Sequence, residues 1–173
     1  EGLYILNVPG FDHTYPIEIS RGIHTNILVT SLKSFYYQRL GLTLERRYAD
    51  KWRRQRSHRD YMCTIHPSAE TETHHSGAIV PCTKGWYNGG DFNKYMVNSG
   101  ITTYTLMSLY EHYPAYIGRI ITNIPESEFL IPDVLDEARW NLDWILAMQD
   151  TTDGGVYHKL THANFVEMVM PQD

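Results

Sequence analysis

The sequence has little of several features that mark whole classes of protein. Only two of its 173 residues are cysteine, and no apolar run approaches the length of a membrane span. The formal net charge is -5, which excludes nucleic acid and a membrane surface as partners bound through overall charge. Internal repeats and low-complexity tracts are absent. The rest of the composition, 42% hydrophobic and 20% charged, is that of a globular chain with a core.

The two cysteines, Cys63 and Cys82, leave two arrangements open, a disulfide across a loop or two free thiols. Several histidines lie near them in the sequence, among them His66 and His74. The spacing of these side chains matches no compact zinc motif, so the sequence predicts no metal and no cofactor.

Aromatic residues are abundant instead, with 13 Tyr and four Trp. Both side chains combine a flat apolar face with a polar edge, and a sugar ring offers the complementary surface. Most of these rings are expected to lie in the core, since that is where large apolar groups usually lie.

Hydrophobic periodicity predicts three helices. The first covers 23–40 and ends at Gly41, a residue suited to stopping a helix. The second begins near Asp91 and covers 91–112, closed by a proline. The third covers 132–149 and begins at a Pro-Asp pair.

The segments between these helices are irregular. Residues 2–8 alternate in the manner of a strand, and 156–160 form a short extended piece. Residues 42–90 show no sustained period, and this loop is longer than a packing connection needs. Its length favours a functional role.

The stretch GWYNGGDFNKY, residues 85–95, resembles the catalytic turn of glycoside hydrolase family 9. Other segments resemble the same family in the same order: 34–41, 97–106, 123–127, 131–150 and 153–161. The resemblance implies an all-α fold, a partial (α/α)6 barrel of the family 9 type. It also implies two parts. Residues 1–19 would be the terminal strand of an immunoglobulin-like domain with a linker, and 20–173 the N-terminal portion of the catalytic domain.

The same resemblance implies an endo-1,4-β-glucanase that hydrolyses β-1,4-glucan with inversion, in a secreted or periplasmic protein. It makes Asp91 the general base, at what we expect to be a helix N-terminus where an anion is stabilised. Asn88 stands where the family has an Asp that helps to hold the water. The family's general acid, a Glu, matches no residue here, so the remaining catalytic segment or a second chain must supply it.

The resemblance also suggests residues that contact substrate. Trp86 and Tyr87 flank the turn and are candidates for stacking on sugar, although core packing is an equal alternative for Tyr87. His158 falls in a segment that the family brings near the cleft. Some family members bind zinc through two Cys and two His, but Thr64 and Lys94 stand at the histidine positions, so no zinc is expected.

Two other functions stay open at this stage. One is an exo-β-glucosaminidase of the same family, because Asn88 indicates an altered pocket. The other is a catalytically silent carbohydrate-binding chain, because one pocket acid is replaced and the other is missing.

Overall fold

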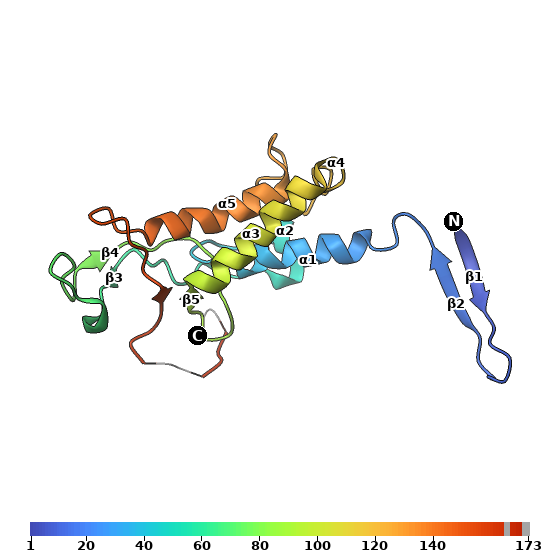
Figure 1. Cartoon of the computed structure of the whole chain (residues 1–173), viewed down its shortest axis with the longest axis horizontal. Coiled ribbons are helices and arrows are strands. Elements are labelled where there is room, and N and C mark those ends of the chain that lie inside the picture. The colour runs from blue at the N-terminus through green and yellow to red at the C-terminus, as the bar shows by residue number, and fades with distance from the viewer. Residues whose placement is uncertain (165–166, 171–173) are drawn as a thin grey trace.

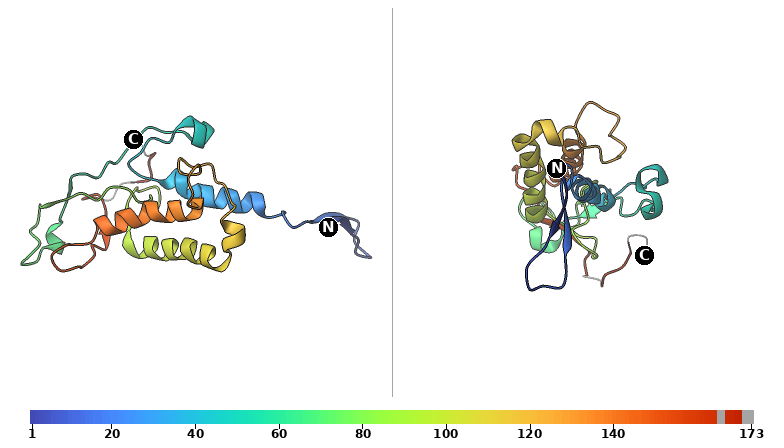
Figure 2. Two further views of the ribbon diagram at one scale, coloured as in Figure 1. Left: turned by 90° about the horizontal axis from the view of Figure 1, so that it is seen from above. Right: turned by 90° about the vertical axis from the view of Figure 1, so that its right-hand side faces the viewer.

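The computed structural model describes residues 1–164 and 167–170. The end of the expected catalytic portion, 165–166 and 171–173, therefore lies outside the described residues. Three long helices form the body: α1 (Thr25–Gln38), α3 (Met96–His112) and α5 (Asp133–Ala147). In Figure 2, α5 lies between α1 and α3, and it packs on both of them. No helix among the described residues is long and apolar enough to cross a membrane.

Shorter elements complete the chain. The short helices are α2 (Arg46–Ala49), α4 (Pro114–Ile117) and two 3-10 turns, η1 (Asp50–Trp52) and η2 (Pro67–Ala69). The strands form three antiparallel pairs: β1 (Gly2–Leu6) with β2 (Tyr15–Ile19), β3 (Cys63–Thr64) with β4 (Ile79–Val80), and β5 (Lys94–Tyr95) with β6 (Lys159–Leu160).

The first two strands form a hairpin that extends away from the helices (Figure 1). Its register pairs Gly2 with Ile19 and Leu6 with Tyr15, and every residue of both strands is exposed. The sequence predicts a terminal strand and a linker over 1–19, and the structure shows two paired strands in this segment. The immunoglobulin-like domain stays a prediction.

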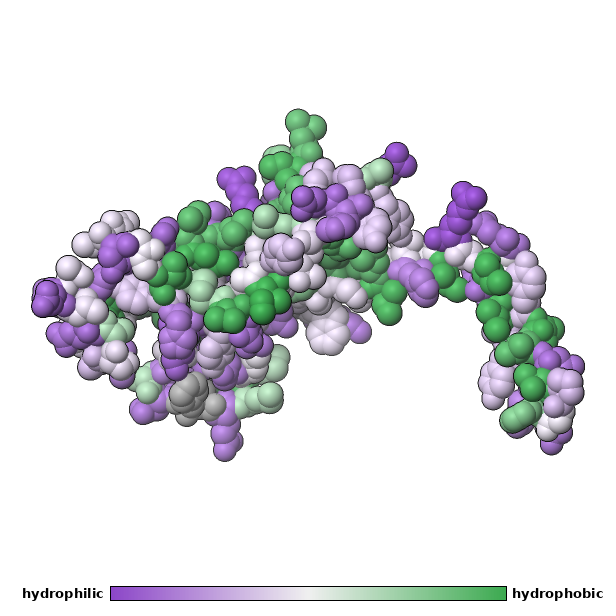
Figure 3. Space-filling model, in the orientation of Figure 1, coloured by the Kyte–Doolittle hydropathy of each residue, from purple (hydrophilic) through white to green (hydrophobic). Residues whose placement is uncertain are grey.

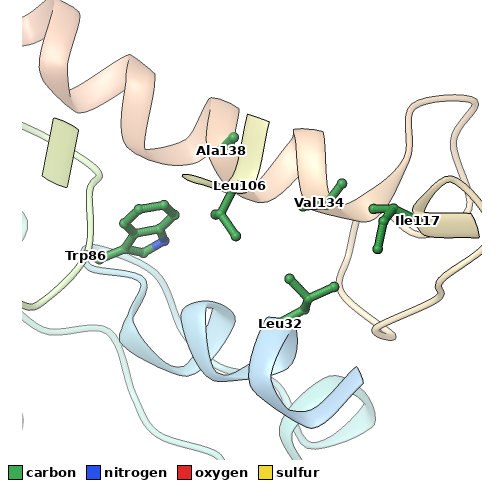
Figure 4. Close-up of a cluster of buried hydrophobic side chains, with 6 residues drawn as sticks. All are labelled: Leu32, Trp86, Leu106, Ile117, Val134 and Ala138. Atoms are coloured by element: carbon green, nitrogen blue, oxygen red, sulfur yellow. The ribbon is translucent and has the colours of Figure 1, made fainter. Parts of the chain in front are cut away.

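The main core lies where the three helices meet, and Figure 4 shows its buried side chains. They are Leu32, Trp86, Leu106, Ile117, Val134 and Ala138. The predicted periodicity of the first and third helices is confirmed, since α1 and α5 supply residues of this core from one face each. Two of the longest elements therefore follow directly from the spacing of apolar residues.

A buried charge lies beside this core. Arg39 is fully buried, and its Nε donates to both carboxylate oxygens of Glu137 at 3.1 Å. Its Nη1 donates to Glu126 at 2.9 Å, and its guanidinium stacks on Trp140 at 4.6 Å from the ring centre. The Arg39 cluster, defined by these four residues, joins the end of α1 to α5 and to the loop before it.

The predicted second helix is wrong at its start, since α3 begins at Met96 and not near Asp91. Lys94 and Tyr95 are extended because they pair with Leu160 and Lys159 of β6. Phe92, with φ 55°, also interrupts any helical course through 91–95. The turn that carries Asp91 is thus separate from the helix.

Gly85 opens this turn in a conformation that a side chain would disturb. Its φ is 84°, and a Cβ there would lie 2.9 Å from Trp144 Cγ and 3.1 Å from Lys94 Cδ. Such crowding costs roughly 1–3 kcal/mol, and the left-handed φ adds to that cost. We therefore expect Gly85→Ala to lower the free energy of unfolding by at least this amount, measured by urea denaturation of the complete protein.

Gly100→Ala is the matched control. It is the same change inside α3, where a Cβ meets no atom within 4 Å among the described residues. Alanine favours a helix over glycine by about 0.5–1 kcal/mol, so this variant should be slightly more stable. Equal stability of the two variants would contradict the crowding at Gly85.

Candidate active site

The turn of residues 85–95 is anchored firmly at its beginning. The amide of Leu40 donates to the carbonyl of Gly85 at 3.0 Å, and the amide of Tyr87 donates to the carbonyl of Gln38 at 2.9 Å. The indole of Trp86 donates to Glu137 at 2.7 Å. Because Glu137 also binds Arg39, the start of the turn is fixed to the Arg39 cluster.

Lys94 anchors the other end of the turn. Its side chain is 1% exposed, and its ammonium donates to the carbonyls of Cys82 at 2.7 Å and Lys84 at 2.9 Å. The same ammonium lies 2.9 Å from a carboxylate oxygen of Asp60. Burial lowers the pKa of Lys94, and Asp60 opposes that effect by favouring the charged form.

Between these anchors the chain makes a tight exposed turn. The amide of Asn88 donates to the carbonyl of Asn93 at 3.1 Å, and the amide of Phe92 donates to the carbonyl of Gly89 at 3.2 Å. Asn88 and Gly89 are exposed at its tip. A polar, accessible tip is therefore held on a rigid base, which is the arrangement that functional loops commonly use.

Asp91 is the one acidic side chain in this turn, and three donors surround it. Its Oδ1 accepts from the amide of Asn93 at 3.2 Å, and its Oδ2 accepts from Asn93 Nδ2 at 2.8 Å and from Tyr95 Oη at 3.1 Å. Partial burial raises the pKa of Asp91, but the hydrogen bonds from Asn93 and Tyr95 outweigh it and the net shift is downward. Asp91 is thus held in its ionised form.

The physical origin of this stabilisation differs from the sequence expectation. Asp91 was expected at a helix N-terminus, but α3 begins at Met96 and Tyr95 precedes its first residue. The helix dipole falls off within the first turn, so the amide and phenol donors replace it. Asn93 and Tyr95, two and four residues after Asp91, are partners that the sequence does not predict.

An open pocket of about 420 Å³ lies over the tip of the turn. Its lining residues are Asn88, Gly89, Gly90, Asp91, Tyr95, Asn98 and Met168. The structure therefore brings Asn88 and Asp91 to the same pocket. Asn98, from the first turn of α3, is a further polar lining group that the sequence did not single out.

Trp86 and Tyr87 are buried, each with 5% of its surface exposed. Trp86 packs on Phe35 with ring centres 5.0 Å apart. Tyr87 packs on Phe92 at 4.8 Å, and its hydroxyl lies 2.8 Å from Nδ1 of His58. Both rings therefore make packing contacts that support the turn. Their contact with a sugar stays a prediction.

His158 is exposed and lines a different hollow, of about 560 Å³, together with Cys63, His66 and Tyr157. Its carbonyl accepts from the amide of Met96 at 2.9 Å. The structure therefore does not bring the His158 side chain to the pocket of Asp91, and its contact with substrate stays a prediction.

The residues at the positions where some family members bind zinc do not suit a metal ion. Cys63 and Cys82 are free thiols, and their Sγ atoms donate to the carbonyls of Asp60 at 3.5 Å and Val80 at 3.4 Å. The interaction between the two thiols lowers the pKa of Cys63 and raises that of Cys82. The buried ammonium of Lys94 lies beside them, bonded to the carbonyl of Cys82. A fixed positive charge here opposes the binding of a cation, so these side chains do not suit zinc.

The absence of zinc remains a prediction with a direct measurement. Elemental analysis of the purified complete protein should find no stoichiometric zinc, and Cys63→Ser should not change the metal content. One tightly held zinc per chain that is lost in Cys63→Ser would contradict this.

One other group among the described residues has ligand atoms close together. His74, Asp150 and Asp153 offer atoms within 4.8 Å of one another. His74 Nε2 lies 2.8 Å from Asp150 Oδ2, and this hydrogen bond holds the pKa of Asp150 well below its usual range. The pair ties the loop after η2 to the residues that follow α5.

Comparison with known proteins places the chain among the glycoside hydrolases. The model of glycosyl hydrolase family 9 matches residues 24–173. The chain therefore belongs to glycosyl hydrolase family 9, and its helices are part of the (α/α)6 barrel of that family.

Two relatives show how much of such a protein the chain represents. It is 46% identical to a xyloglucan-specific endo-beta-1,4-glucanase of Bacteroides ovatus, over 99% of this chain and 29% of that protein. It is 31% identical to endoglucanase D of Acetivibrio thermocellus, over 100% of this chain and 27% of that protein. The chain thus spans less than a third of the length of these relatives.

Solved structures agree with this placement. A family 9 structure from Bacteroides ovatus superposes with a TM-score of 0.87 at 39% identity, over 100% of this chain and 36% of that one. A thermostable endoglucanase variant from Alicyclobacillus acidocaldarius gives a TM-score of 0.81 at 26% identity, over 98% of this chain and 30% of that one.

Proposed function

We propose that the complete protein is an endo-acting β-1,4-glucanase that cleaves its substrate with inversion, with Asp91 as general base. The observation that carries this proposal is the Asp91 carboxylate, held ionised by three donors at an open pocket. The names of the relatives, an endo-beta-1,4-glucanase and an endoglucanase, support the reaction class. Because such polysaccharides lie outside the cell, we also propose that the protein is exported.

The chemistry follows from the charge state of Asp91. An inverting glycosidase uses one carboxylate to deprotonate a water and one carboxylic acid to protonate the leaving oxygen. An ionised Asp91 can accept the proton of the water, while Asn88 can orient that water through its amide but cannot ionise. The general acid lies outside this chain in our proposal.

Exposed apolar side chains on the helices support the proposal that further parts of the protein pack against them. Val97, Ile101 and Tyr104 form a stripe on α3, each about two-thirds exposed at 68%, 66% and 70%. Figure 3 shows such apolar surface gathered over the helices and along the hairpin. We propose that the remaining helices of the barrel cover this stripe. The 173-residue chain by itself should therefore be inactive.

The test is an assay of the complete protein on carboxymethyl cellulose, xyloglucan and chitosan oligomers. Internal cleavage of a β-1,4-glucan, with an α-configured product seen by NMR, is the expected result. Release of single glucosamine units from chitosan oligomers would instead favour the exo-β-glucosaminidase, for which Asn88 in the pocket is the supporting observation. Binding of cello-oligosaccharides without turnover would identify a silent carbohydrate-binding protein.

Asn88→Asp gives a prediction about pH. A second carboxylate at the pocket should improve the holding of water and raise turnover on cellulose. A like charge nearby also raises the pKa of Asp91. As the pH falls, Asp91 therefore becomes protonated at a higher pH than in the wild type. The acid limb of the profile of kcat/KM against pH should therefore move upward. Lower cellulose turnover in Asn88→Asp would mean that Asn88 serves a different sugar.

A further inference from the structure

Asn88 and Gly89 form the only Asn-Gly pair in the sequence. This pair is chemically reactive because glycine has no Cβ to keep its amide nitrogen away from the side chain of the preceding asparagine. Both residues are exposed at the tip of the turn. Water therefore has access to the reacting atoms.

The local structure leaves both reacting groups available. Among residues 1–164 and 167–170, neither the side-chain amide of Asn88 nor the backbone N–H of Gly89 has a hydrogen-bond partner. The Asp91 carboxylate is close, since its Oδ1 lies 3.9 Å from the place of a Cβ on Gly89. The Asp91 carboxylate, an ionised acceptor, thus lies near Gly89.

We propose that Asn88 is a site of spontaneous deamidation that places a new carboxylate in the pocket of Asp91. The backbone nitrogen of Gly89 attacks Cγ of Asn88, a C–N bond forms, and the side-chain nitrogen leaves as ammonia with the proton from Gly89. Water then opens the five-membered imide at either carbonyl and gives aspartate or isoaspartate. The reaction consumes one water, releases one ammonia and needs no oxidant or reductant.

Asn93 provides an internal comparison in the same turn. It is 2% exposed, and its Nδ2 donates to Asp91 at 2.8 Å and to Tyr95 at 3.3 Å. Its Oδ1 accepts from the amide of His162 at 3.2 Å. The residue after it is the buried Lys94. Every polar atom of this amide is occupied, so Asn93 should not react.

Mass spectrometry tests the proposal on the complete folded protein, aged at mildly alkaline pH. Trypsin cleaves after Lys84 and Lys94 in the denatured protein and releases one peptide, 85–94, that contains both asparagines. We expect the mass of Asn88 to increase by the exchange of its amide for a carboxyl group while Asn93 is unchanged. Equal conversion at both positions, or none at Asn88 after prolonged ageing, would overturn the proposal.

Gly89→Ala is the matched control. Alanine fits at this position, since its Cβ would meet only Asp91 Oδ1 at 3.9 Å and the φ is not left-handed. The added methyl group hinders the attack, and conversion at Asn88 should become several-fold slower. An unchanged rate would contradict the imide route.

The consequence for catalysis rests on the proposed function and is measured separately. Turnover of the aged protein on cellulose should approach that of Asn88→Asp in proportion to the aspartate fraction. Conversion without any change in turnover would uphold the modification and contradict the role of position 88 in holding water. The two failures are therefore distinguishable.

Discussion

Asp91→Asn is expected to lower kcat of the complete enzyme by about 10²–10⁴-fold, the usual effect of losing a general base. The substitution keeps the size of the side chain but removes the group that accepts the proton of the water. An amide nitrogen would also face the donors of Asn93 and Tyr95, which now bind a carboxylate oxygen. We therefore expect a loss of stability of about 1 kcal/mol as well.

The matched control is Asp12→Asn, which removes the same charge from the exposed loop of the hairpin. It should leave turnover unchanged, and circular dichroism should show both variants folded. If Asp91→Asn keeps turnover near that of the wild type, Asp91 is not the base. The turn would then be a structural element, and the silent carbohydrate-binding protein would become the better proposal.

Glu137→Gln should produce the largest loss of stability. Its side chain is 5% exposed and binds both Arg39, which is fully buried, and the indole of Trp86. Burial raises the pKa of Glu137, and the nearby guanidinium of Arg39 opposes that shift. Removing one partner from a buried ion pair costs about 3–5 kcal/mol, and here only the part-exposed Glu126 would remain to compensate Arg39. We expect urea denaturation of the complete protein to show a loss of this size.

Glu126→Gln makes the same chemical change on the same arginine, but Glu126 is 28% exposed. Water can compensate the charge there, so the loss should be about 1 kcal/mol or less. Equal losses in the two variants would show that burial does not decide the contribution of each carboxylate. The pair of variants therefore tests the Arg39 cluster without relying on the absolute stability.

The sequence predicted the three long helices because their apolar spacing is a local signal. It did not predict the start of α3, because Lys94 and Tyr95 are held extended by β6, more than sixty residues further along the chain. The burial of Trp86 was missed for the same reason, since its partner Glu137 is 51 residues away. Long-range pairing of this kind leaves no periodic signal in either segment.

The sequence likewise predicts only part of the candidate site. The motif identified Asp91 and Asn88, and the structure brings both to one pocket. The predicted helix over 91–112 would place Tyr95 inside a helical turn. The structure holds Tyr95 extended ahead of α3, where its hydroxyl donates to the Asp91 carboxylate.

The hairpin of β1 and β2 has a consequence for experiments on the intact protein. A two-stranded hairpin alone is marginally stable in water, and all its side chains are exposed here. Its amide hydrogens should therefore exchange rapidly with solvent unless another surface covers the strands. Hydrogen exchange across residues 2–19 thus becomes a direct reporter of whether a neighbouring β-domain is docked, independent of the state of the catalytic turn.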